Sequence, residues 1–167
     1  QAVIKANTVI GPMCKIGGEV GGTIFQGYAN KVHDGHLGDS IVGEWVNLGA
    51  GTTNSNLLNT YGEIILKTLD GKRHKTGRSY LGCFVGDHVK TAICTRIMTG
   101  TIIGTGAMIA SSTPAQSPTP RFSWVTDGVA RAYNINKFVA VAKTVMERRN
   151  EKLHKSTDAV IRQLASE

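Results

Sequence analysis

The sequence is poor in the residues that define several common protein classes. It has only three cysteines, Cys14, Cys83 and Cys94, and no CxxC pair, so neither a disulfide framework nor a zinc ribbon is expected. This cysteine usage fits a reducing, cytoplasmic environment. The apolar runs are far too short to span a bilayer, and no signal-peptide pattern opens the chain. We therefore expect no membrane partner.

The chain is strongly basic but contains few aromatic residues. The net charge is +7, aromatic residues make up 6% of the chain, and the basic clusters at 67–78 and 143–155 contain no interleaved aromatic residues. A surface that stacks nucleic-acid bases needs such residues. The charge therefore favours a phosphate-rich metabolite over nucleic acid. The chain opens at Gln1 within what looks like a repeat, which predicts a longer parent protein.

What the chain has in abundance is glycine, at 20 of 167 residues, together with a six-residue hydrophobic period. This period matches neither an amphipathic helix nor an alternating strand. Three hexads form one triangular coil, whose inward side chains stack on those of the next coil. The sequence thus predicts a mainly β fold, a left-handed parallel β-helix over residues 1–112, and with it a homotrimer. The recurring residues are Ile4, Ile10, Ile16, Val42, Leu48, Val85, Thr91, Ile97, Ile103 and Ile109.

The period breaks in two places. Around Lys31–Leu37 the register slips, which suggests an insertion near a corner of a coil. Residues 56–79 form a longer irregular insertion, in which Asp70-Gly71 predicts a tight hairpin between Glu63–Thr68 and Arg73–Ser79. Loops that depart from a repeat often carry function.

The last third of the chain departs from the repeat. Residues 113–133 read as a Pro-rich connector, and residues 134–167 as two helices. Asn134 or Asn136 can cap the first helix, which runs to about Lys152, and the second can start at Ser156 or Thr157. We expect these helices to cover one side or end of the solenoid. A membrane-binding amphipathic helix stays open as an alternative.

Two motif blocks resemble a known family. The stretch His33-Asp-Gly-His36-Leu-Gly-Asp39-Ser40, followed by Val42-Gly-Glu-Trp-Val-Asn47-Leu-Gly-Ala-Gly-Thr52, resembles the acetyltransferase domain of the bifunctional N-acetylglucosamine-1-phosphate uridyltransferase family. That family shows GHLxYLGD before IGxxVNIGAGTxxxN. The later run from Gly71 to Val89 is closer to archaeal-type sugar-1-phosphate nucleotidyltransferases with an acetyltransferase tail. The similarity covers roughly residues 9–111.

The resemblance implies acetyl transfer from acetyl-CoA to the amine of an amino-sugar-1-phosphate, with His33 as the catalytic base. An imidazole is suited to deprotonate such an amine. His33 can instead be an ordinary surface or core histidine, or half of a His-x-x-His metal pair with His36, although no metal is expected. His36 stands where the family has a tyrosine that contacts the acceptor.

Further acceptor and cofactor residues follow from the resemblance. Asn47, Asn54, Asn56 and Glu19 align with or lie near acceptor contacts, although Asn47 can instead join a stacked amide ladder. The family's lysine for the sugar phosphate is missing near Gly21 and Gly22; Lys15, Lys31 or a neighbouring subunit can replace it. Lys72, Arg73 and Arg78 are candidates for the phosphates of coenzyme A, or else a solvated hairpin tip. Ala110 and Ser111 align with small residues along the pantetheine arm.

Two other functions stay open. The domain can be a non-catalytic trimerisation and regulatory part of a sugar nucleotidyltransferase, which the changes at His36 and at the missing lysine favour. It can also be a metalloenzyme of the γ-carbonic anhydrase type, which would use His33, His36, His74 and His88.

Overall fold

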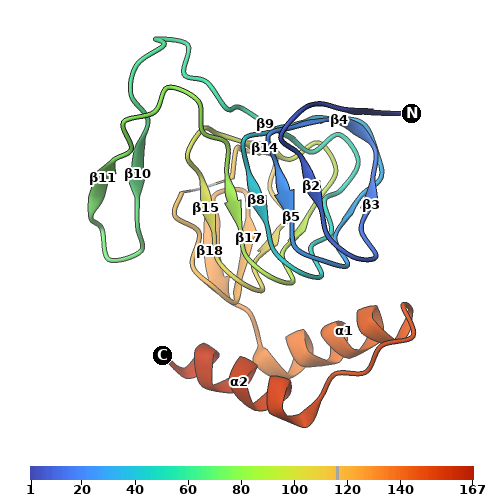
Figure 1. Ribbon diagram of the computed structural model, residues 1–167. Coiled ribbons are helices and arrows are strands. Elements are labelled where there is room, and N and C mark those ends of the chain that lie inside the picture. The colour runs from blue at the N-terminus through green and yellow to red at the C-terminus, as the bar shows by residue number, and fades with distance from the viewer. Residues whose placement is uncertain (116) are drawn as a thin grey trace.

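A computed structural model describes residues 1–115 and 117–167, and it shows a three-sided solenoid of short parallel strands (Figure 1). The chain visits the first, second and third faces in turn, and each strand pairs with the strand one coil later. The predicted left-handed parallel β-helix is confirmed. It positions outward side chains in columns that run along each face.

The strands of the three faces are as follows. The first face holds β1 (Ala2–Ile4), β4 (Gly18–Gly21), β7 (His36–Gly38), β9 (Thr53–Asn54) and β14 (Arg96–Ile97). The second holds β2 (Val9–Ile10), β5 (Ile24–Phe25), β8 (Ile41–Val42), β12 (Phe84–Val85) and β15 (Ile102–Ile103). The third holds β3 (Lys15–Ile16), β6 (Asn30–Lys31), β13 (Lys90–Thr91), β16 (Met108–Ile109) and β17 (Ser123–Thr126), with β18 (Val129–Ala132) antiparallel to β17.

The core is a set of inward columns of aliphatic side chains, as the six-residue period predicts. The register changes lie elsewhere than expected. Inward positions follow Ile16 at Val20 and Phe25, so the first corners are shorter than a full hexad, and no insertion is present at 31–37. Lys31 itself takes the inward position below Ile16, with 2% of its surface exposed. A lysine reads as an outward residue, which is why the sequence pattern places the break there.

Ala115 and residues 117–126, within the expected connector, continue the solenoid. Ala115 packs in the core, Thr119 bridges Ile103, and β17 pairs in parallel with β16. Prolines break long strands, but a coil of two-residue strands needs few backbone donors and tolerates them.

The 56–79 insertion contains the predicted hairpin, formed by β10 (Ile65–Lys67) and β11 (Arg73–Lys75). Figure 1 shows it standing apart from the coils. The side chains of Ile64 and Leu66 lie near Gly100, so the hairpin flanks the later coils.

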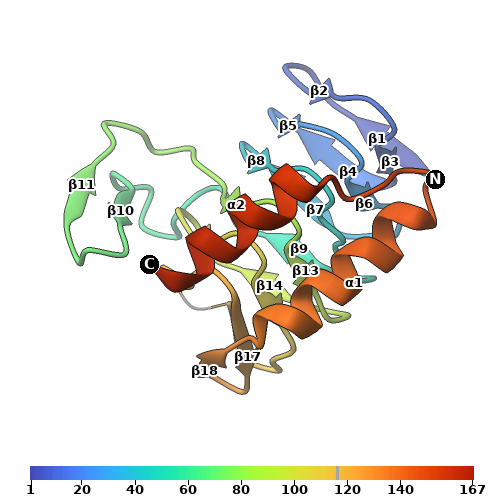
Figure 2. The same cartoon turned by 90° about the horizontal axis from the view of Figure 1, so that it is seen from below.

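Helix α1 (Ile135–Glu147) is capped by the Asn134 side chain and ends earlier than predicted, while α2 is Lys155–Ser166. Figure 2 shows both helices lying along one side of the solenoid. Phe138, Val139 and Ala142 of α1 are buried. Among the described helices, none is long and apolar enough to cross a membrane.

Helix α1 covers a column of side chains at the corner between the second and third faces. Tyr28, Trp45 and His88 all have positive φ, between 52° and 60°, and occupy the same corner in successive coils. The Tyr28 and Trp45 rings stack with centroids 4.1 Å apart, and the Trp45 and His88 rings with centroids 6.2 Å apart. Phe138 closes the column edge-on against His88.

Candidate functional site

A row of polar side chains crosses the first face. Glu19 and His36 are outward partners in the adjacent strands β4 and β7. His36 Nδ1 lies 3.3 Å from Glu19 Oε1, and Lys5 Nζ donates to the same oxygen at 2.5 Å. The Lys5 ammonium, with a smaller contribution from His36, holds the pKa of Glu19 below its ordinary value. Glu19 is therefore an ionised acceptor near neutral pH.

Asn56 extends this row toward the corner with the second face. Gly38 is the meeting point, since a Cβ built there would lie 2.7 Å from His36 Nε2 and 2.8 Å from Asn56 Nδ2. Asn56 Nδ2 also donates to Asp39 Oδ2 at 2.6 Å. Three of the predicted acceptor residues, Glu19, His36 and Asn56, are thus brought together on one surface.

His33 lies at the edge of this row, in the turn between β6 and β7. Two features fix the turn. Lys31 Nζ, from inside the coil, donates to the carbonyl oxygens of His33, Gly35 and Gly17 at 3.1, 2.7 and 3.1 Å. Gly35 has φ of +123°, and a Cβ there would lie 2.1 Å from Thr52 O, so only glycine fits. The His33 side chain is exposed at this corner.

An open pocket of about 320 Å³ joins the turn to the row. It is lined by Gln1, Val3, Gly18, Glu19, Asp34, Gly35 and His36. Carboxylates, an imidazole and nearby amide groups are the side chains that bind sugar hydroxyls and amines. The arrangement can therefore hold a small polar molecule next to Asp34 and Gly35 of the turn; His33, one residue earlier, is not among the residues that line the pocket.

Two asparagines of the predicted site lie elsewhere. Asn54 points into the coil with 6% of its surface exposed; its amide bonds the backbone N–H and C=O of Gly38 and the hydroxyl of Ser40. Asn47 lies on the third face, where its Oδ1 accepts from Asn30 Nδ2 at 2.8 Å, the amide-ladder arrangement.

The cofactor residues separate into two groups. Ala110 and Ser111 follow β16 just as Val32 and His33 follow β6, so both pairs lie at the same corner of the solenoid, several coils apart. Lys72, Arg73 and Arg78 are exposed on or beside the β10–β11 hairpin, and Lys72 pairs with Asp70 at 3.0 Å. Leu69 at the hairpin tip lines a pocket with Pro120 and Glu167, away from the His33 turn.

Lysines expected to replace the missing phosphate ligand do not reach the row. Lys15 is outward on the third face, and Lys31 is inside the coil. Lys5, which follows inward Ile4, is the lysine beside Glu19, and sequence reasoning missed it together with Asp34 and Asp39. The signal for Lys5 is its place just after β1, one coil before the Gly21–Gly22 position.

The histidines do not converge. His74 lies on the hairpin and His88 in the buried aromatic column, both away from His33 and His36. Across the residues that the structure describes, no group of three metal-ligating side chains is positioned to hold an ion.

Fold and surface together define a hexapeptide-repeat solenoid with a polar pocket at one corner. No family model matches the sequence. The chain is 36% identical over 111 residues to a bifunctional sugar-1-phosphate nucleotidylyltransferase/acetyltransferase of Sulfurisphaera tokodaii, covering 65% of this chain and 27% of the relative. It is 31% identical over 126 residues to the bifunctional protein GlmU of Methanococcus maripaludis, covering 74% and 30%.

A bacterial relative shows the same relation: the bifunctional protein GlmU of Thermodesulfovibrio yellowstonii is 30% identical over 119 residues, covering 70% of this chain and 24% of the relative. The resemblance to bifunctional sugar-1-phosphate nucleotidylyltransferase/acetyltransferases is therefore confirmed. The matches span between about a quarter and a third of the length of these relatives.

Proposed function

We propose that this chain transfers an acetyl group from acetyl-CoA to the amine of an amino-sugar-1-phosphate, as the C-terminal part of a sugar-nucleotide synthesising enzyme in the cytoplasm. The observation that carries the proposal is the convergence of Glu19, His36 and Asn56 beside the turn of His33. The Sulfurisphaera tokodaii relative is named for a nucleotidylyltransferase and an acetyltransferase activity.

In the proposed reaction the acceptor lies in the pocket of the first face. Glu19, His36 and Asn56 bind its hydroxyl groups, and Lys5 replaces the missing lysine at its phosphate. The amine nitrogen attacks the thioester carbonyl, and His33 accepts the proton that the amine loses. A backbone N–H at the corner stabilises the oxyanion. The C–S bond then breaks, and coenzyme A leaves as the thiol after protonation.

The cofactor is placed along the corner that His33 shares with Ala110 and Ser111, where small side chains leave room for a pantetheine arm. Within one protomer, the hairpin that carries Lys72, Arg73 and Arg78 lies away from this corner. In the proposal they grip the phosphates of coenzyme A bound to a neighbouring protomer, which requires an oligomer.

A homotrimer is supported by the second face. Its outward column consists of the apolar side chains Val9, Ile24, Ile41, Phe84 and Ile102, one from each strand of the five-stranded sheet. Val9, Ile24 and Ile41 are 57%, 43% and 39% exposed. A continuous apolar column of this kind is a self-association surface.

The proposal is tested by thiol release. The purified chain is mixed with acetyl-CoA and either glucosamine-1-phosphate or galactosamine-1-phosphate, and free thiol and acetylated product are measured. We expect release that depends on the amino sugar and falls at least tenfold in Glu19→Gln. Glu147→Gln, an exposed carboxylate on α1, is the control. Release no faster than without enzyme would leave a non-catalytic trimerisation domain.

A further inference from the structure

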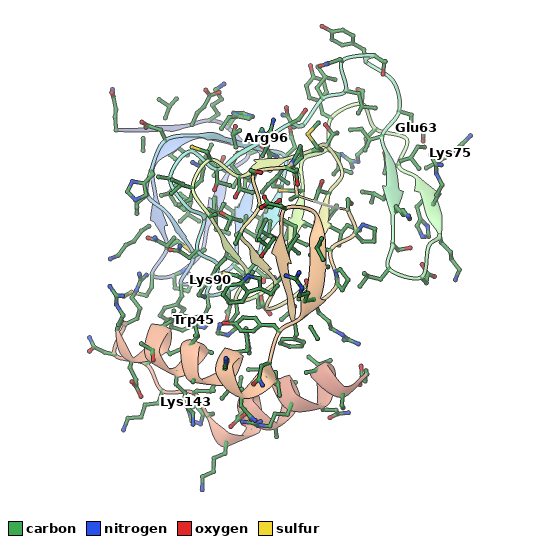
Figure 3. The ribbon with its side chains drawn as sticks, turned by 180° about the vertical axis from the view of Figure 1, so that it is seen from behind. Trp45, Glu63, Lys75, Lys90, Arg96 and Lys143 are labelled. Carbon is green, nitrogen blue, oxygen red and sulfur yellow. The ribbon has the colours of Figure 1, made fainter. Side chains whose placement is uncertain are left out.

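A second polar pocket lies on the third face, between the solenoid and the end of helix α1. Its volume is about 410 Å³. The solenoid side contributes Tyr28, Trp45 and Val46 at the corner, and the helix side contributes Val145, Arg148 and Arg149. Figure 3 shows Trp45 and Lys90 on the side of the solenoid that faces α1. This pocket is on a different face from the Glu19–His36 row.

The floor of the pocket is a column of four outward side chains in register: Lys15, Asn30, Asn47 and Lys90. Strands in a sheet lie about 4.8 Å apart, so the column is roughly 14 Å long. Asn30 donates to Asn47, which fixes the two amides relative to each other. Two amides are thus flanked by an ammonium group at each end.

The pocket is strongly cationic. Its lining contains Lys15, Lys90, Arg148 and Arg149, and the described lining residues include no carboxylate. Two carboxylates act on the lining residue Tyr28 from outside the pocket: Glu151, which accepts from the Tyr28 hydroxyl at 2.6 Å, and Glu44. Arg149 is anchored by a hydrogen bond to the carbonyl oxygen of Met13. Four cations without an acid among them concentrate a positive potential in one cavity.

Lys90 is a half-buried cation of this pocket with little compensation for its lost hydration. Among the described residues, its ammonium makes one hydrogen bond, a long contact of 3.5 Å to the carbonyl oxygen of His88. Burial lowers the pKa of Lys90 to about 8. A partly desolvated ammonium gains much more from an anion than an exposed one does, because water no longer screens the interaction.

We propose that this pocket binds a phosphate-bearing sugar or nucleotide, at a site separate from the acetyl-transfer pocket. The phosphate meets Lys90 and the two arginines that follow α1, while the paired amides of Asn30 and Asn47 bind hydroxyl or carbonyl groups. The Tyr28–Trp45 stack lines one end of the pocket, with Trp45 enclosed between Tyr28 and His88 and 7% exposed. The volume suits a ligand of this size.

The test uses Trp45 as a reporter. The chain has two tryptophans, so Trp124→Phe leaves the indole of Trp45 as the sole one. This variant is titrated at low salt with inorganic phosphate, glucose 1-phosphate, uridine monophosphate and uridine, and Trp45 fluorescence is followed. We expect a saturable change with the two phosphorylated metabolites and none with uridine. Inorganic phosphate measures how much of the affinity the phosphate supplies alone.

Variants assign the site. Lys90→Met and Arg148→Gln should each weaken the affinity at least tenfold, whereas Lys143→Met, an exposed lysine of α1 outside the pocket, should not. Glu19→Gln should also leave the affinity unchanged, because it belongs to the other pocket. Three results would overturn the proposal. They are no fluorescence change at ligand concentrations up to about 10 mM, an affinity that survives both pocket variants, and an affinity that is lost in Glu19→Gln. If Lys90→Met does not fold, Arg148→Gln and Lys15→Met decide.

Discussion

Lys31→Met tests whether a buried lysine holds the turn that carries His33. The Nζ group donates to three backbone carbonyls, two of them in this turn and one in the preceding coil. Methionine keeps the length of the aliphatic stem but removes all three donors. The acceptors of Gly17, His33 and Gly35 then lose their protein partner.

The magnitude follows from two opposing effects. A hydrogen bond from a charged donor contributes about 1.5–3 kcal/mol, so three would contribute several kcal/mol. Burial of the ammonium offsets part of this, and it also lowers the pKa of Lys31. We therefore expect Lys31→Met to lower the free energy of unfolding by about 2–4 kcal/mol.

Urea denaturation followed by circular dichroism at pH 7 measures this loss. Lys137→Met, which removes an exposed lysine of α1, should change stability by less than about 0.5 kcal/mol. At low denaturant, where Lys31→Met is still folded, its kcat should fall about tenfold because His33 is less well placed. A variant as stable and as active as the parent would refute the role given to Lys31.

Three further predictions concern other parts of the chain. Lys90→Met should raise the free energy of unfolding at pH 7 by about 1–2 kcal/mol. The lowered pKa of Lys90 sets an upper limit of roughly 3 kcal/mol, and the partial exposure of the group reduces it. The unfolded chain keeps the Lys90 proton up to a higher pH than the folded chain does, so the stability of the parent should rise between about pH 8 and pH 10 as Lys90 loses its charge. The groups that face Lys90 are Lys15, Arg148, Arg149 and His88. Urea denaturation at several pH values should show this rise in the parent and not in the variant. Gly35→Ala should cost about 3 kcal/mol or more, because of its φ and the contact with Thr52 O; a melting temperature within a degree or two of the parent would contradict this. Ile41→Arg should dissociate the proposed trimer in light scattering, whereas Val160→Arg, at an exposed position of α2, should not.

The fold was predictable because each face of a coil takes about six residues, so inward side chains recur at that period. The sequence pattern is wrong where the type of a residue does not indicate whether its side chain points into or out of the coil. Lys31 points inward because carbonyl groups at an adjacent corner satisfy its ammonium. Residues 117–126 continue the coils although the prolines of this segment suggest a linker, because short strands require few backbone donors.

The candidate site could be predicted only in part. Motif alignment gives His33, Glu19, His36 and Asn56, and the register of the first face brings the last three together. Alignment alone cannot tell that Asn54 points inward and Asn47 faces away, since a one-residue shift along a strand reverses the face. The pairing of Lys5 with Glu19 joins residues one coil apart, which no local motif reveals.

The pocket beside α1 depends on contacts between distant segments. Tyr28 meets Glu151 across 123 positions of sequence, and Arg149 meets Met13 across 136. Such contacts follow from the docking of α1 on the aromatic column of Tyr28, Trp45 and His88. The positive φ of these three residues gives no sequence signal, because such corners favour asparagine and glycine.

The acetyl-transfer rate of His33→Ala tests the central claim most directly. The variant and the parent are compared at saturating acetyl-CoA and amino-sugar phosphate, with His154→Ala, an exposed histidine before α2, as the control. We predict that His33→Ala lowers kcat by about 10²–10⁴ while circular dichroism and trimer mass stay unchanged. A folded His33→Ala trimer that transfers acetyl groups as fast as the parent would contradict the account.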